Sequence, residues 1–268
     1  MPAGADPAPP LRCGSPRVRI HPAQAAYADL GLPDGIPSLA EFNTAAAAAR
    51  LAHLDGRRLS FVAALPSCPA IAYERRIAER GEIPLRAGDA HDAWNARAWL
   101  AFPRTKSALN AIHAAAGVAA TANARGRERD AATLLDESGV IAAGVDPTFV
   151  ARWRARAWRA AFGIPAEALR QTLAVAVVGH GLLARLERPF PGLTAKALLL
   201  ALDPATLPEG AAARRQALDA AAAARLADRG RGLAPADLLP LPLASVAEWD
   251  PAQRGDRRFD DRSVFRPR

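Results

Sequence analysis

The sequence predicts a mainly helical α+β fold with two or three short β-hairpins, and three observations carry this prediction. The chain has 268 residues, of which 50% are hydrophobic, so it can bury a full core. Several long segments repeat apolar residues at the helical period, and several short ones alternate apolar and polar residues. We expect a single globular domain at residues 18–248, with a flexible tail at 1–17 and a C-terminal tail at 249–268 that packs on the domain.

The first part of the domain is expected to begin with a helix and to continue with short strands. Ser38 and Glu41 have the spacing of a capping box, which predicts that a helix starts there. Residues 59–65 alternate like a strand. Residues 73–86 are expected to form two short strands around Gly81, although the segment YERRIAER alone also fits a helix.

A proline divides the most polar stretch of the chain, residues 91–113, into two parts. Pro103 cannot donate a backbone hydrogen bond and disfavours helical geometry at the residue before it. Two helices, over 91–102 and 104–120, are therefore expected to meet at this proline.

The next elements are predicted by turn and cap residues. Residues 132–144 are expected to form a hairpin whose turn lies at 136–139. Asp146 and Pro147 have the residue types that open a helix, and a further helix is expected after Pro165.

The last third of the domain is rich in alanine and proline. Residues 208–228 predict a helix in which Arg215 and Asp219 form an i,i+4 pair. Residues 233–253 are punctuated by prolines and are expected to wrap over the domain in an extended form. The longest apolar run, LAVAVV at 173–178, is far shorter than the ~20 residues that cross a bilayer.

Scarce polar residues gather in the stretch 91–113. Lys106, Asn110 and His113 recur at i, i+4 and i+7 and share one helix face, while His91 and Asn95 lie one turn apart on the preceding helix. Such a face is either a solvated surface or part of a site. Of 35 basic residues, 33 are arginine, so the retained lysine favours a site.

Several segments together resemble the bacterial domain of unknown function family 3025. They are YERRIAERGEIPLR, HDAWNARAWLAFPRTKSALNAIH, RGRERDAATLLDESG, GHGLLARLERPFPGLTAKALLL and FDDRSVFRP, and they span most of the chain. The resemblance carries no activity to transfer. In that family a Glu often stands one turn after the histidine of Gly179-His180, whereas this chain has Ala184, so no carboxylate role is implied there.

A first hypothesis for the site is a divalent metal centre. Imidazole and carboxylate groups are suitable ligands for zinc, manganese or iron, and an open coordination position would activate water. No HExxH motif is present to fix the spacing. The candidate ligands are His91, Asp92, His113 and His180, with Asp130 or Asp136.

A second hypothesis is a metal-free pocket for a small anionic, phosphate-bearing substrate. In it His113 or His91 would move a proton, because histidine titrates near neutrality. Cationic side chains would hold the anion. The candidate binding residues are Lys106, Lys196, Arg104 and Arg129, together with the amides of Asn95 and Asn110.

A third hypothesis is a binding module without catalysis. The formal net charge is +8, and the segment RWRARAWR at 152–159 could form an arginine-rich helix that meets nucleic acid or an acidic protein. Alternatively, Trp153 and Trp158 belong to the core and the arginines form a solvated face. No zinc finger, RNP motif or glycine-rich phosphate loop supports nucleic-acid binding.

Location and function follow from these patterns. Cys13 and Cys68 belong to no metal or redox spacing, and the N-terminus lacks the basic cluster and apolar core of a secretory signal, which favours a reducing cytoplasm and no membrane association. The sequence does not indicate an oligomeric state. We expect a metal-assisted hydrolase or transferase acting on a small anionic substrate, with the anion-binding module as the alternative.

Overall fold

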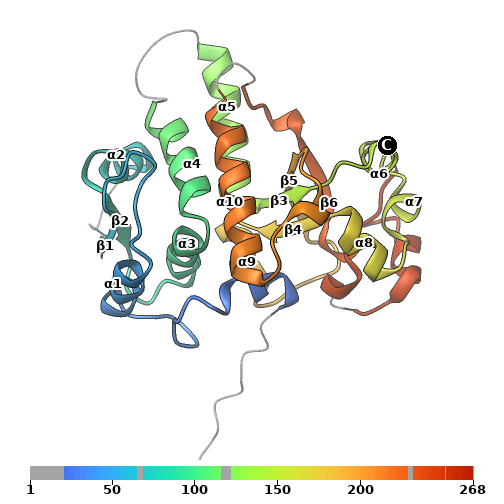
Figure 1. The fold of residues 1–268 in the computed structure, drawn as a ribbon, viewed down its shortest axis with the longest axis horizontal. Helices are drawn as coiled ribbons and strands as arrows, with labels where there is room; N and C mark the ends of the chain where they lie inside the picture. Colours follow the sequence, from blue (N-terminus) through green and yellow to red (C-terminus); the bar gives the residue numbers. More distant parts are fainter. Residues whose placement is uncertain (1–20, 65–68, 116–121, 229–231, 251, 268) are drawn as a thin grey trace, which may run out of the picture.

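A computed structural model describes residues 21–64, 69–115, 122–228, 232–250 and 252–267, and it has the expected mainly helical α+β fold (Figure 1). The predicted tail at 1–17 lies outside the described residues. The α-helices are α1 (Leu39–Ala48), α2 (Ala70–Arg80), α3 (Ala90–Ala101), α4 (Pro103–Ala115), α5 (Ala122–Ser138), α6 (Pro147–Arg154), α7 (Trp158–Phe162), α8 (Ala166–Thr172), α9 (His180–Arg185) and α10 (Ala211–Ala227).

The strands are short and form two sheets. They are β1 (Ser60–Ala63), β2 (Glu82–Leu85), β3 (Gly139–Ala143), β4 (Ala174–Val177), β5 (Thr194–Leu200) and β6 (Leu238–Pro242). Short 3₁₀ helices complete the chain: η1 (Pro22–Tyr27), η2 (Pro204–Thr206), η3 (Pro235–Asp237), η4 (Leu243–Ser245), η5 (Ala247–Trp249) and η6 (Gly255–Asp260).

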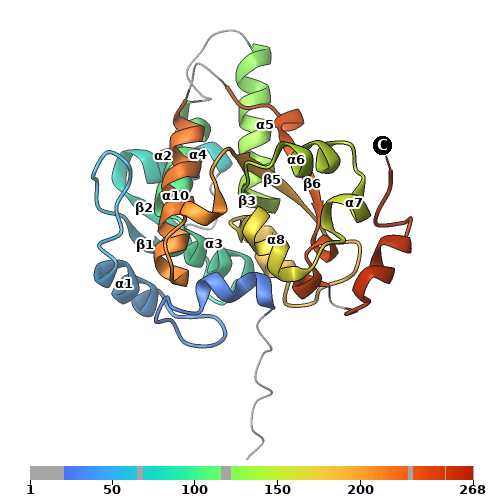
Figure 2. The ribbon, with the colours of Figure 1, turned by 45° about the vertical axis from the view of Figure 1, so that its right-hand side comes forward.

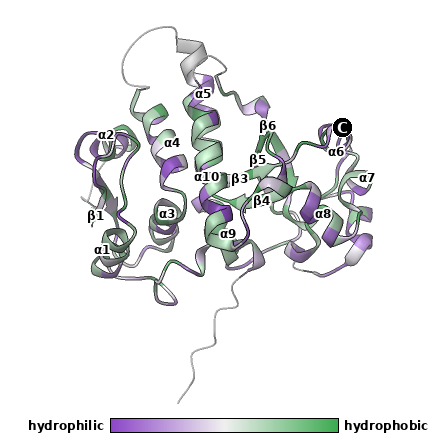
Figure 3. Cartoon of the chain, in the orientation of Figure 1, coloured by the Kyte–Doolittle hydropathy of each residue, from purple (hydrophilic) through white to green (hydrophobic). Residues whose placement is uncertain are grey.

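The larger sheet has the strand order β4-β3-β5-β6, and the central pair β3 and β5 is parallel while the outer pairs are antiparallel. Every residue of β3 is buried, as expected of a strand covered on both faces. Figure 3 shows this sheet in the green of hydrophobic residues. Helices α5 and α10 both pack on β3 and β5, which places the main core here (Figure 2).

The smaller sheet consists of β1 and β2, which are parallel and are joined by helix α2. Its core is a second cluster, to which α3 contributes Ala93, Ala96 and Trp99. The C-terminal end of α3, at Ala101, and the following Phe102 belong instead to the main core. Because α3 lies between two apolar clusters, most of its residues are buried, and its side chains are fixed by packing on two sides.

The predicted strands at 73–86 are only partly correct. Residues up to Arg80 form helix α2, and only the segment after Gly81 is a strand. Gly81 ends the helix with φ +70°, and a Cβ there would lie 2.2 Å from the carbonyl oxygen of Arg58, so the helix ends at a position that only glycine fits. The glycine predicted as a turn between strands is the C-cap of a helix.

The predicted hairpin at 132–144 is wrong in its first half. Helix α5 continues through Ser138, and β3 follows without a turn. Ala131, Ala132 and Leu135 recur at helical spacing and are fully buried, so tertiary packing outweighs the turn preference of the polar residues after them. Asp136 therefore lies on a helix rather than in a loop.

The break at Pro103 and the capping box of Ser38 with Glu41 are both confirmed.

The predicted pair of Arg215 with Asp219 is wrong. Asp219 instead accepts hydrogen bonds from the backbone N–H groups of Arg104 (3.0 Å) and Thr105 (2.7 Å) at the start of α4. The Asp219 carboxylate thus accepts hydrogen bonds from backbone N–H groups that have no partner within α4. Such capping hydrogen bonds stabilise a helix more than an exposed ion pair does.

The arginine-rich segment 152–159 is not one helix. Helix α6 ends at Arg154, Arg156 has φ +56°, and α7 begins at Trp158. Trp153 and Trp158 are buried and donate their indole N–H groups to backbone carbonyls. The tryptophans thus belong to the core, as the alternative interpretation of this segment predicts.

The C-terminal region contributes to the fold more than its prolines predict. Residues 238–242 form β6, an edge strand of the larger sheet, instead of only wrapping over the domain. Phe259 and Phe265 are buried in the main core.

Among the described residues, no helix combines the length and the apolar character that a membrane crossing needs.

Candidate metal centre

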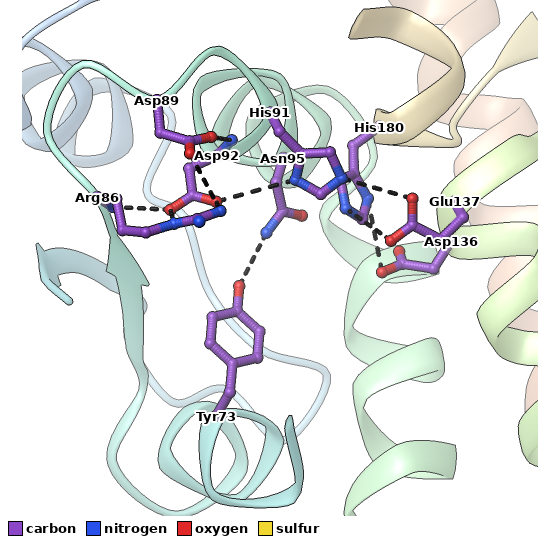
Figure 4. A network of polar contacts seen from close by, with 9 residues as sticks. All are labelled: Tyr73, Arg86, Asp89, His91, Asp92, Asn95, Asp136, Glu137 and His180. Atoms are coloured by element: carbon purple, nitrogen blue, oxygen red, sulfur yellow. Dashed lines mark hydrogen bonds and ion pairs between the residues drawn. The ribbon is translucent and has the colours of Figure 1, made fainter. Parts of the chain in front are cut away.

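Two imidazoles and one carboxylate meet where three helices converge (Figure 4). His91 lies in the first turn of α3, Glu137 in the last turn of α5, and His180 at the first residue of α9. Helix α9 packs against both α3 and α5, so the three side chains come together although they are far apart in the sequence.

The Glu137 carboxylate is shared between the two histidines. Its Oε2 atom lies 3.5 Å from Nε2 of His91, and its Oε1 atom lies 3.5 Å from Nε2 of His180. The two imidazole rings are 4.5 Å apart at their centroids and are inclined by 76°. One ligand atom from each of the three residues lies within 4.8 Å of the others.

The opposite nitrogen of each imidazole faces an aspartate. Nδ1 of His180 lies 3.6 Å from Oδ2 of Asp136, and Nδ1 of His91 lies 3.9 Å from Oδ1 of Asp92. Both histidines thus present Nε2 to Glu137 and Nδ1 to an aspartate. In metal sites a carboxylate in this position accepts the second N–H of the imidazole, and here both carboxylates lie just beyond hydrogen-bond distance and act through their charge.

Each aspartate is in turn held by a cation. Arg86 donates to Asp92 through its backbone N–H (2.7 Å), its Nε (3.0 Å) and its Nη2 (2.7 Å). Lys106 forms an ion pair with Asp136, and its side chain is 4% exposed. Paired aspartates keep their charge and position, so they can orient the imidazoles in front of them.

Burial sets the protonation state of the inner half of the centre. Burial lowers the pKa of His180, whose side chain is 6% exposed, so this imidazole is neutral at neutral pH. For Asp136, burial raises the pKa, but the charge and the hydrogen bond of Lys106 oppose it most strongly, and the net shift is downward. A neutral imidazole beside an ionised carboxylate is the pairing that a metal ligand and its outer partner require.

The outer half of the centre is open to solvent. The side chains of His91 and Glu137 are 44% and 47% exposed. A ligand or a water molecule can therefore reach the point between the three side chains from this side, while Asp136 closes the other side.

Two glycines allow helix α9 to approach α5. A Cβ at Gly181 would lie 2.3 Å from Oε2 of Glu137, and one at Gly179 would lie 2.2 Å from the backbone nitrogen of Gly139. Neither position has room for a larger residue unless a neighbour shifts. The Gly-His-Gly sequence thus places the His180 imidazole against the end of α5.

The donor set fits a divalent cation. Four-coordinate sites with ligand bonds of about 2.0–2.1 Å separate neighbouring ligand atoms by about 3.3 Å. The two Nε2-to-carboxylate distances of 3.5 Å are close to this separation and longer than a good hydrogen bond. Nδ1 of His180 is buried without a hydrogen-bond partner among the described residues, and the Asp136 carboxylate 3.6 Å away attracts it through its charge.

Other predicted residues gather in a second polar cluster behind Asp136. Lys106, Asn110 and His113 line a cavity of about 10 Å³. Asn110 donates to the Glu74 carboxylate (2.6 Å), and burial raises the pKa of Glu74 to about 7. This cavity is about the size of one water molecule, so it has no room for a phosphate-bearing substrate.

The remaining predicted residues are dispersed. Among the described residues, potential metal ligands also gather at Asp89, His91 and Asp92. His113 belongs neither to that group nor to the cluster of His91, Glu137 and His180, and burial lowers its pKa. Asn95 donates to the hydroxyl of Tyr73 (2.8 Å) below His91. Outside these clusters, Arg104 lines a groove beside α10, Arg129 and Asp130 are exposed on α5, and Lys196 lies on β5 without a polar contact to the described site residues.

Glu137 is the one residue of the three-residue cluster that sequence reasoning missed. It was obscured because the segment around it was predicted to be a turn, whereas the end of α5 aims it at both histidines. The doublet Asp136-Glu137 on a helix would have indicated it, since adjacent helical residues point about 100° apart and can serve two histidine nitrogens.

The fold and the site together define a mainly helical α+β protein with a two-histidine, one-carboxylate cluster. The chain belongs to the family described as "Protein of unknown function (DUF3025)", whose model matches residues 59–268. That range includes His91, Glu137 and His180. No curated protein and no solved structure matched the chain.

Proposed function

We propose that His91, Glu137 and His180 hold a divalent metal ion, and that the protein uses it for hydrolysis or group transfer on a small anionic substrate. The observation that carries this proposal is the placement of the two Nε2 atoms, each 3.5 Å from one oxygen of the same carboxylate. Each imidazole also has an aspartate behind it.

A direct ion pair is a weaker explanation of the same contacts. Burial lowers the pKa of His180, so at neutral pH this ring carries no charge to attract Glu137. The distances are also too long for good hydrogen bonds. A cation between the three side chains accounts for both facts, because it binds neutral imidazole and carboxylate at once.

The ligand types favour zinc, manganese or iron. Three protein ligands with a solvent-facing side leave coordination positions for water and substrate. A bound ion would supply a water of lowered pKa at this position. The negative charges of Asp136 and Asp92, 3.6 and 3.9 Å from the Nδ1 atoms, would favour the tautomer with the proton on Nδ1 and the lone pair on Nε2.

The anionic substrate is supported by the net charge of +8, which attracts anions to the molecule. Lys106 does not hold the substrate in this proposal, because it is buried and paired with Asp136. Its part is to keep Asp136 ionised behind His180. A cytoplasmic location is proposed on the sequence grounds given above.

The test is hydrolysis of a panel of phosphate mono- and diesters by chelator-treated protein, with and without added Zn²⁺, Mn²⁺ or Fe²⁺. We expect hydrolysis that depends on added metal and is lost in Glu137→Gln. Glu209→Gln is the matched control, since Glu209 is exposed and forms no ion pair with the described residues. Metal-independent hydrolysis that survives in Glu137→Gln would overturn the proposal.

A binding module is the second candidate, supported by the exposed side chains of Arg152, Arg154 and Arg156 around the turn between α6 and α7. Arg154 and Arg156 form no ion pair with the described residues. The test is a salt-dependent gel shift with single- and double-stranded nucleic acid. Binding that is lost when these three arginines become glutamine would favour this candidate, and equal binding by the variant would remove it.

A further inference from the structure

A cavity of about 360 Å³ lies apart from the metal centre, between η1, β4, α8, α10 and η5. Its walls are mainly apolar, and their larger members are Leu169, Leu173, Val175, Leu218 and Trp249. The volume is within the range of small-molecule sites, about 300–1,000 Å³. It would hold about twelve methylene- or water-sized groups at roughly 30 Å³ each.

The charge in the cavity wall is positive. Among the described residues of the lining are three arginines and one carboxylate, Glu248, which is paired with Arg170. Arg214 has no carboxylate partner among the described residues, and its one hydrogen bond is to the carbonyl of Pro204 at 3.4 Å. An apolar cavity thus has an unneutralised guanidinium at its wall.

A second arginine of α10 is buried with part of its hydrogen-bonding capacity unused. The Arg215 side chain is 10% exposed, and its Nη1 is bonded to Asp29 and to the carbonyl of Ala26. Its Nε is buried and has no partner in the described chain. Arg215 is thus fixed beside Arg214 by its contacts with Asp29 and Ala26, and its charge adds to the positive potential of this wall.

We propose that this cavity binds an amphipathic monoanion, namely a hydrocarbon chain of about eight to twelve carbons that ends in a carboxylate. The chain would bury against the apolar wall of α8 and β4, and the carboxylate would pair with Arg214 beside Arg215. Guanidinium and carboxylate form two parallel hydrogen bonds, so the head group gives the site its selectivity.

This site does not rest on the proposed metal chemistry. His91, Glu137 and His180 are absent from its lining. The two sites are nevertheless neighbours along the chain, because β4 lines the cavity and leads within three residues to His180. Ligand binding is therefore measured on chelator-treated protein, where a failure says nothing about the metal centre.

The experiment is isothermal titration of the full chain with decanoate, decanol and decyltrimethylammonium, each below its micelle concentration. We expect saturable binding of one decanoate per chain, at least tenfold weaker binding of decanol and none of the cation. Arg214→Gln should weaken decanoate at least tenfold and leave decanol unchanged. Arg154→Gln, an exposed arginine outside the cavity, is the matched control.

A filling variant tests the cavity itself. Val175→Trp should abolish binding of both decanoate and decanol, whereas Val145→Trp, at a position 49% exposed and outside the cavity, should not. Circular dichroism and thermal melting establish that each variant is folded. If Val175→Trp fails to fold, Ala166→Trp, at an exposed position in the lining, replaces it. Decanoate binding that is absent in the wild type, equal to that of decanol, or unaffected by Arg214→Gln overturns the proposal.

Discussion

Gly181 lies directly against the carboxylate of Glu137, so closely that a Cβ at residue 181 would be 2.3 Å from Oε2. Glu137 is the residue that joins the two histidines of the candidate centre. A single methyl group at Gly181 would therefore displace the carboxylate that the two imidazoles share and leave the imidazoles and their aspartates, Asp92 and Asp136, untouched. The closest clash is with the end of a side chain, which can move, and the backbone oxygen of Glu137, 3.0 Å from the Cβ position, needs to shift only by a few tenths of an ångström.

The first prediction concerns this contact. Gly181→Ala should weaken binding of the divalent ion at least tenfold, because the Glu137 carboxylate must turn away from His91 and His180. Its melting temperature without metal should stay close to that of the wild type. Gly126→Ala is the control: this helical glycine has open space at the Cβ position, and the change should stabilise the chain by about 0.5–1 kcal/mol and leave metal affinity unaltered. If Gly181→Ala and Gly126→Ala bind the divalent ion with equal affinity, Glu137 is not a ligand of the metal.

The second prediction concerns the buried ion pair behind His180. Lys106→Met removes the cation but leaves Asp136 in a site where its side chain is 17% exposed. An unpaired buried charge costs about 3–5 kcal/mol, which should appear as a lower free energy of unfolding in urea. Lys106→Met combined with Asp136→Leu should recover much of that loss, because no charge is then left behind. If the double variant is no more stable than the single one, the pair does not act as described.

The third prediction concerns the pH dependence of stability. Burial and the charge of Asp136 raise the pKa of Glu74 from 4.5 to about 7. The folded state therefore holds this proton more tightly than the unfolded state. The resulting contribution, an upper limit of roughly 3 kcal/mol, is complete below about pH 4.5 and is lost as the pH rises to about 7.

Glu74→Gln provides the measurement, because glutamine resembles the protonated acid. Its free energy of unfolding should change less than that of the wild type between pH 4.5 and 7, and the variant should be the more stable protein at pH 8. The side chain of Asn110, which donates to Glu74 in the native protein, can donate to the amide oxygen in the same way. Parallel pH profiles for the two proteins would contradict the raised pKa.

The fourth prediction separates the two histidines of the centre, His91 and His180, from His113, the other histidine of the polar stretch. His113 lines the small cavity behind Asp136 and is in neither metal-like grouping of described residues. His113→Gln should therefore keep the metal stoichiometry of the wild type and lower only the stability. Loss of the metal in this variant would return His113 to the ligand set that sequence reasoning predicted.

Local signals in the sequence predicted the elements whose ends are set by short-range chemistry. The capping box at Ser38, the break at Pro103 and the cap at Asp146 all act over a few residues, and all three are found. Where a helix continues because its apolar residues are buried by distant parts of the chain, the local signal fails. At the end of α5 the turn-forming residues 136–139 were predicted to interrupt it for this reason.

The same limit applies to the candidate centre. His91 and His180 were predicted as ligands from residue type alone, and they do lie side by side. Glu137 was not predicted, because the rotation of α5 about its axis decides which of its acidic side chains faces the histidines. That rotation depends on the packing of α5 against β3 and β5. Similarly, nothing local in the sequence indicates that Lys106 points inward to Asp136 instead of outward to a substrate.

The most direct measurement is the stoichiometry of metal binding by isothermal titration of chelator-treated protein with Zn²⁺, repeated with Mn²⁺ and Fe²⁺. We predict one ion per chain for at least one of these metals, with binding lost in Glu137→Gln and in His180→Gln and kept in Glu209→Gln. A folded wild-type protein that binds none of the three metals, or a Glu137→Gln variant that binds as the wild type does, would contradict the assignment of His91, Glu137 and His180 as a metal centre.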